Sequence, residues 1–156
     1  MNSMRQLMAA LGSAGVLAGV AAPAMAGDLL LTRHDATFLI ESDVGKPYWT
    51  LQAQCAGVFG AAYAYETAQQ QPAKAQAMKD NGVAMLESAI ARLRYDRSLD
   101  RGAALTLAAD EVEHGRAIAK TELDRSGVGP DSGWNWLRSA CLDIAGAERR
   151  HEGVSD

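Results

Sequence analysis

The residues best suited to chemistry in this sequence form two Glu-x-x-His motifs, one from Glu111 to His114 and one from Glu148 to His151. Residues three apart lie on one face of a helix, so each motif can offer a carboxylate and an imidazole to a metal ion. In di-iron bundles, two such motifs combine with one glutamate from each of the two remaining helices. The pattern therefore raises the hypothesis of a dimetal centre.

The two further glutamates of such a centre would be Glu66 and Glu87, but the register of the helices argues against the site. With neighbouring helices antiparallel, the two motifs lie about 12 to 18 residues apart along the bundle, which at ~1.5 Å per residue is roughly 20 Å. The ions of a dimetal site lie within about 4 Å of each other. We therefore expect no cofactor.

A single metal ion at Glu111 and His114 is the alternative left open, in a small metal-handling or hydrolytic protein. Two ligands one turn apart need a third, which the sequence does not identify. The competing interpretation is a solvated helix face from Asp110 to Arg116 with local ion pairs. The sequence contains neither a G-x-S-x-G elbow nor a Walker motif, and a non-enzymatic protein is therefore favoured over an enzyme.

The two cysteines, Cys55 and Cys141, can form one disulfide bond. An even pair in a small exported domain is typical of a disulfide. Buried free thiols and a redox-active thiol are the alternatives, but neither cysteine belongs to a C-x-x-C motif. Closing a loop of about 86 residues stabilises a fold by roughly 4 to 5 kcal/mol in the chain-entropy model.

Export is predicted by residues 1–26, which have the pattern of a cleavable signal peptide. A positively charged start is followed by an apolar run from Leu7 to Val20 and by Ala24-Met25-Ala26, a small-x-small cleavage site. The run of about 14 residues is shorter than the roughly 20 that a spanning helix needs. We expect cleavage between Ala26 and Gly27, a periplasmic or secreted product, and no stable membrane insertion.

The composition fits one modest globular domain, because 48% of the residues are hydrophobic and 22% are charged. Removal of the leader removes Arg5 and no acidic residue, so the net charge changes from −4 to −5. An acidic chain without a basic patch has no electrostatic attraction to nucleic-acid phosphates. We therefore expect no nucleic-acid partner.

Apolar residues at three- and four-residue spacing predict four helices, over residues 47–70, 72–95, 100–125 and 132–149. Their starts are marked by prolines or capping residues: Pro47, Pro72, Ser98 or Asp100, and Ser132. In the second helix, Asn81-Gly82 predicts a kink or a break. The apolar face expected for the third helix comprises Leu105, Ala108, Val112, Ala119 and Leu123.

The first helix carries a second stripe, made of small residues: Ala53, Gly57, Gly60 and Ala64. Such a stripe allows the backbone of another helix to approach closely. The neighbouring helix can belong to the same monomer or to a second copy in a homodimer. The first helix is therefore expected to contact neighbours on two sides.

Four amphipathic helices with short connections predict an all-α, up-down four-helix bundle over residues 47–150, stapled by the disulfide between its first and last helices. This register places Trp134 near Phe59 or Tyr63. Residues 27–46 form an N-terminal arm, and residues 151–156 form a flexible tail. The β-prone runs of the arm predict either a short hairpin or an extended segment, with a helical turn over residues 36–41 as the alternative.

Two aromatic residues lie out of phase with the apolar faces of their helices. Tyr48 adjoins Trp49 at the start of the first helix, and Trp136 lies two residues beyond Trp134. An exposed aromatic side chain is a candidate anchor for a partner protein. The alternative interpretation is that Tyr48 and Trp136 each cover a helix end.

The layout resembles the periplasmic immunity proteins that neutralise type VI amidase toxins. Those are small helical bundles stapled from the first helix to a Cys-Leu-Asp sequence in the last, as Cys141-Leu142-Asp143 is placed here. The resemblance implies an inhibitor that acts by binding a protein. We therefore expect an exported module that binds a partner protein or its own copy.

Overall fold

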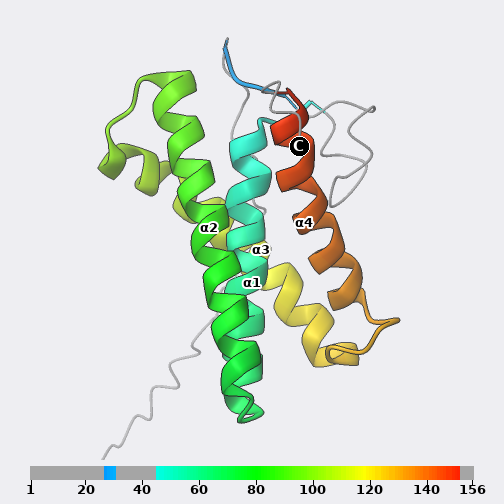
Figure 1. Ribbon diagram of the computed structural model, residues 1–156. Helices are drawn as coiled ribbons and strands as arrows, with labels where there is room; N and C mark the ends of the chain where they lie inside the picture. The colour runs from blue at the N-terminus through cyan, green and yellow to red at the C-terminus, as the bar shows by residue number, and fades with distance from the viewer. Residues whose placement is uncertain (1–26, 31–44, 152–156) are drawn as a thin grey trace, which may run out of the picture.

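The computed structural model describes residues 27–30 and 45–151, with side-chain surroundings as far as Ile144. Within these residues the chain forms four helices (Figure 1): α1 (Tyr48–Ala68), α2 (Pro72–Arg97), α3 (Arg101–Ser126) and α4 (Gly133–His151). None of the described helices is both long and apolar enough to cross a membrane. The predicted signal peptide (residues 1–26) and residues 152–156 of the predicted tail lie outside the described residues.

Helix α1 lies at the centre of the described fold, and the other three helices pack around it. Every residue from Pro47 to Phe59 is buried, including the polar side chains of Thr50, Gln52 and Gln54. Figure 1 shows α2 and α4 on opposite sides of α1, while α3 crosses α1 diagonally. The prediction that α1 is amphipathic is therefore wrong for its first half, because neighbours cover it on all sides.

Helix α3 crosses α1 with backbone against backbone, and two glycines make this possible. A Cβ atom added to Gly57 would lie 1.9 Å from the carbonyl oxygen of Val112, and one added to Gly115 would lie 1.9 Å from that of Gln54. No side chain fits in either space. The predicted small-residue stripe of α1 thus packs within the monomer at Gly57.

Helix α2 packs antiparallel to α1, and Met85, Ala89 and Leu93, which recur at four-residue spacing, are all buried. The helix runs unbroken through Asn81-Gly82, so the predicted kink is absent. A Cβ atom on Gly82 would lie 3.4 Å from both the Ala56 carbonyl oxygen and the Phe59 Cβ atom of α1. Gly82 therefore serves close packing of the two helices rather than a bend.

The helix starts follow the capping chemistry of the sequence. The Asp100 carboxylate accepts a hydrogen bond from the Ala103 amide at 2.9 Å and caps α3. The Ser132 hydroxyl accepts one from the Asn135 amide at 3.2 Å at the start of α4. Pro72 is the first residue of α2, whereas Pro47 precedes α1 as its N-cap residue. The predicted boundaries agree with the observed ones to within about two residues.

The helical class is confirmed, but a regular up-down bundle is not, because the helices are arranged around α1 instead of a common axis. The apolar face of α3 also differs from the prediction, since Leu105 is 46% exposed. Its buried face instead consists of small residues, one glutamate and one leucine: Ala104, Ala108, Glu111, Gly115, Ala119 and Leu123. Small side chains let α3 approach α1 closely.

Of the predicted arm, residues 27–30 are described and residues 31–44 are not, so the hairpin and the turn over residues 36–41 lie outside the described residues. Leu30 forms an isolated antiparallel bridge with Pro47. The Tyr48 amide donates a hydrogen bond of 2.8 Å to the Leu29 carbonyl oxygen. The start of the arm is therefore attached to the start of α1.

Candidate functional site

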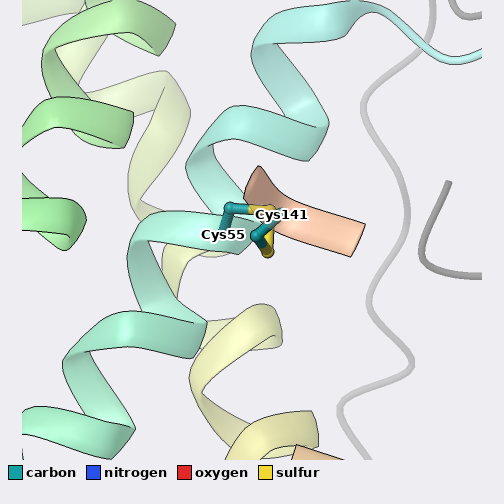
Figure 2. The surroundings of a disulfide bond; sticks show 2 residues. All are labelled: Cys55 and Cys141. Atoms are coloured by element: carbon teal, nitrogen blue, oxygen red, sulfur yellow. A yellow bond between two sulfur atoms is a disulfide. The ribbon is translucent and has the colours of Figure 1, made fainter. Parts of the chain in front are cut away.

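The disulfide joins the central helix to the last helix. Cys55 of α1 and Cys141 of α4 are bonded at 2.09 Å with their Cα atoms 5.5 Å apart, and both residues are completely buried (Figure 2). The predicted pairing is confirmed. Because the bond lies within both helices and not at their ends, it fixes the register of α4 along α1 as well as the contact between them.

The aromatic contact next to the disulfide confirms the predicted register. The ring of Trp134 meets the ring of Phe59 edge-on, with centroids 6.2 Å apart and an interplanar angle of 87°. Offset and edge-to-face pairs are the favourable arrangements of aromatic rings. The contact joins a residue one turn after Cys55 in α1 to a residue two turns before Cys141 in α4, as expected for antiparallel helices.

Trp136 points away from this contact and is 53% exposed. The other two tryptophans, Trp49 and Trp134, are 0% and 4% exposed. Ser139 and Asp143 follow Trp136 at three- and seven-residue spacing on the same face of α4 and are also exposed. The outer face of α4 therefore presents one large aromatic side chain beside polar residues.

Tyr48, the other proposed binding residue, is not available to a partner. Its exposed fraction is 0%, and it belongs to the same core cluster as Cys55 and Phe59, with Leu29 packed against that cluster. The prediction that Tyr48 points away from the core is wrong. The position of Tyr48 on the helix relative to Trp49 did not predict its exposure, because this part of α1 is buried on every side.

Glu111 and His114, the two residues of the single-metal alternative, are not joined by a third ligand in the described part of the chain. Glu111 is 5% exposed, at the crossing of α1 and α3, and its Oε2 atom accepts a hydrogen bond of 2.7 Å from Gln54 Nε2. His114 is half-buried. Among the described residues no three His, Cys, Asp or Glu side chains are grouped to hold a metal ion. The interpretation of Asp110–Arg116 as a solvated face is wrong for Glu111, because that side chain is buried.

The remaining glutamates of the dimetal hypothesis lie in other surroundings. Glu66 is buried in α1, while Glu87 of α2 forms a two-point ion pair with Arg101 of α3 at 2.6 and 2.7 Å. Hydrogen bonding from Arg101, together with its charge, lowers the pKa of the Glu87 carboxyl against the smaller opposing effect of desolvation. The side-chain surroundings of Glu148 and His151 lie outside the described residues.

A buried ion pair next to the N-terminal arm was not foreseen from the sequence. Asp28 accepts hydrogen bonds from Arg97 Nε at 3.1 Å and from Arg97 Nη2 at 2.6 Å. The side chain of Asp28 is 0% exposed and that of Arg97 is 11% exposed. The guanidinium carbon of Arg97 lies 5.1 Å from the centroid of the Trp49 ring. Local sequence patterns do not predict a pair between residues that are 69 positions apart.

A pocket of about 260 Å³ lies at the turn between α1 and α2. Three glutamines line it together with aromatic, hydroxyl and small apolar side chains: Tyr63, Thr67, Gln70, Gln71, Pro72, Ala75 and Gln76. Its lining residues include no carboxylate, imidazole or thiol. Its lining residues are remote in sequence from Trp136.

The chain matches no protein-family model, and it has no significant match among curated proteins or solved structures. The assignment of a function therefore rests on the residues described above.

Proposed function

We propose that this protein is an exported, non-enzymatic helical module that binds a partner protein, with Trp136 as the anchor of the interface. In the concrete form suggested by the resemblance to periplasmic immunity proteins, the partner is an enzyme that the module inhibits. Self-association through the same surface is the alternative, and the experiments below separate the two.

The observation that carries the proposal is the exposure of Trp136 on a rigidly held helix. Tryptophan is among the residues that contribute most to binding at interfaces, where a central aromatic side chain is surrounded by polar groups. Trp134 and Cys141 on the opposite face attach α4 to α1. The backbone of such a helix is already ordered, so little backbone entropy is lost on binding, which favours affinity.

Export is supported by the sequence of residues 1–26 together with the disulfide. Disulfides persist in oxidising compartments and are rare in the cytosol. The bond between Cys55 and Cys141 is buried and joins segments 86 residues apart, as expected for a structural rather than a redox-active bond. The periplasm or the exterior of the cell is therefore the proposed location.

The test is affinity capture from envelope and culture extracts with the processed wild-type protein and with Trp136→Ala. Tyr95→Ala is the matched control, because Tyr95 is 81% exposed on a different helix. We expect one protein to be captured by the wild type and the control, and to be reduced at least about tenfold with Trp136→Ala. Equal capture by all three proteins would exclude Trp136 as the anchor.

Tryptophan fluorescence gives an independent measurement with the purified partner. Since Trp136 is the exposed one of the three tryptophans, its quenching by acrylamide should fall when the partner covers it. If quenching falls when the protein is concentrated without a partner, and light scattering gives twice the monomer mass, the result would instead support self-association. Inhibition of the captured protein's enzymatic activity would support the immunity-like form of the proposal.

A further inference from the structure

The turn between α1 and α2 holds a glutamine in a backbone conformation that favours glycine. Gln70, with a φ of 56°, follows Gln69, the C-cap residue of α1. The Gln70 amide donates a hydrogen bond of 3.0 Å to the Thr67 carbonyl oxygen, and the Gln71 amide donates one of 3.0 Å to that of Glu66. This pair of bonds is a Schellman motif, in which the left-handed position is usually a glycine. Glycine would therefore close α1 with less strain than glutamine does.

The side chain of Gln70 lines the pocket at this turn. The pocket has a volume of about 260 Å³ and lies at the lower end of the molecule in Figure 1, where the chain passes from α1 to α2. Ala75 is the one buried residue of its lining, and the other six are exposed, so the pocket is a surface depression with Ala75 at its base. A strained residue that contributes its side chain to a cavity is a candidate functional residue.

The lining of the depression favours a neutral ligand. None of its seven residues carries a charge. A charged ligand would give up part of its hydration there without gaining a group of opposite charge. The nearby Asp80 carboxylate already accepts a hydrogen bond of 2.7 Å from Gln76 Nε2. That bond orients the Gln76 carboxamide, whose Oε1 atom can accept from a ligand.

The polar and aromatic groups of the lining match the surface of a sugar ring. Gln70, Gln71 and Gln76 each offer N–H donors and a carbonyl acceptor. Tyr63 is 41% exposed and offers an aromatic face for apolar contact. A sugar presents hydroxyl groups that both donate and accept, together with an apolar face of C–H groups. The volume lies below the roughly 300 to 1,000 Å³ of drug-sized sites, which suits a single sugar unit.

We propose that the depression at the α1–α2 turn binds one neutral sugar unit, with the Gln70 carboxamide as a specificity-determining group. The backbone strain at Gln70 is the cost of placing a hydrogen-bonding side chain where glycine would close the helix. The site does not involve Trp136, so the proposal is independent of the protein-binding function proposed above.

The test is an NMR titration of the purified protein with N-acetylglucosamine, followed by the side-chain amide signals of Gln70, Gln71 and Gln76. For a ligand of this size we expect a Kd of about 1 mM. Absence of saturable shifts at about 50 mM, well above that Kd, would overturn the proposal. Glucuronate, a charged sugar, should bind more weakly, and a capped alanine tripeptide should not bind. Equal binding of glucuronate, or tighter binding of the peptide, would overturn the assignment of a neutral sugar.

A pair of glycine variants separates binding from folding. Gln70→Gly should raise the Tm by about 1 to 5 °C, because it relieves the strain, and should raise the Kd about threefold to tenfold, because it removes the carboxamide. Ser98→Gly is the matched control, since Ser98 has a φ of 54° at the end of α2 and does not line the depression. It should raise the Tm similarly and leave the Kd unchanged. An unchanged Kd for Gln70→Gly, or equal changes in Kd for both variants, would overturn the role of Gln70.

Discussion

Gly57 of α1 and Gly115 of α3 lie at the crossing of the two helices, and each receives the backbone of the opposite helix in the place of a side chain. The carbonyl oxygens of Val112 and Gln54 occupy the two positions, each 1.9 Å from where a Cβ atom would stand. Each of these residues lies three positions before a glycine of its own helix, so the contact is reciprocal. The buried α1 depends on this close crossing.

Replacement of Gly115 by alanine should strongly destabilise the protein. The new methyl group would collide with main-chain atoms, which cannot move to another rotamer, so we expect a loss of about 3 kcal/mol or more, the upper end of the range for overpacking. The free energy of unfolding in guanidinium chloride, followed by circular dichroism, measures the loss.

The matched control is Gly60→Ala, one turn along α1 from Gly57. A Cβ atom there would lie 3.6 Å from Arg116 Nη2, an ordinary contact with a flexible side chain. Because alanine favours helices over glycine by about 1 kcal/mol, Gly60→Ala should stabilise the protein. Equal losses for Gly60→Ala and Gly115→Ala would contradict the crossing described here.

Removal of the disulfide should lower the free energy of unfolding by about 4 to 5 kcal/mol. The double variant Cys55→Ala/Cys141→Ala tests this loss, because it leaves no free thiol. Denaturant unfolding with and without a reducing agent provides the control: the reductant should destabilise the wild type and leave the double variant unaffected. A wild type that is insensitive to reduction, with its sulfurs shown to be reduced, would refute the prediction.

Gln54 and Glu111 should be energetically coupled, because their side chains form a buried hydrogen bond at the crossing. A double-mutant cycle with Gln54→Ala and Glu111→Ala isolates this coupling. We expect about 1 to 3 kcal/mol, as is typical of hydrogen bonds to charged groups. Additive effects of the two substitutions would show that the contact contributes nothing to stability.

The Glu87 carboxyl should titrate below its ordinary range, because the Arg101 hydrogen bonds and charge lower its pKa. A pKa that is lower in the folded than in the unfolded state adds stability above the ordinary glutamate pKa. That stability is lost as the pH falls through the folded-state value. NMR titration of the Glu87 carboxyl measures the shift, and Arg101→Gln should return its pKa toward normal. Arg125→Gln, at another exposed ion pair, should leave it unchanged.

Local patterns were enough to predict the helices, their caps and the pairing of the cysteines. Apolar spacing in α2 and α4 coincides with the buried faces, and capping residues such as Asp100 stand where helices start. The contact between Phe59 and Trp134 was also predicted correctly, and it followed from the disulfide. A covalent bond sets the register of two helices, which converts sequence spacing into spatial position.

The burial of Tyr48 and Glu111 could not be predicted in this way. Periodicity identifies the buried side of a helix only when the other side faces solvent, and the first half of α1 has no such side. Glu111 reads as a surface residue because charged side chains are rarely buried without a partner. Its partner, Gln54, is 57 positions away in the sequence.

The sequence alone determined what depends on neighbours along the chain: where helices start and end, which faces of α2 and α4 are apolar, and which two sulfurs can pair. The tertiary structure alone decided that α1 is central, that Gly57 and Gly115 allow the crossing, and that Asp28 pairs with Arg97. These features arise because segments distant in the chain share one space, and the energies of close packing and buried charge are set by that shared space.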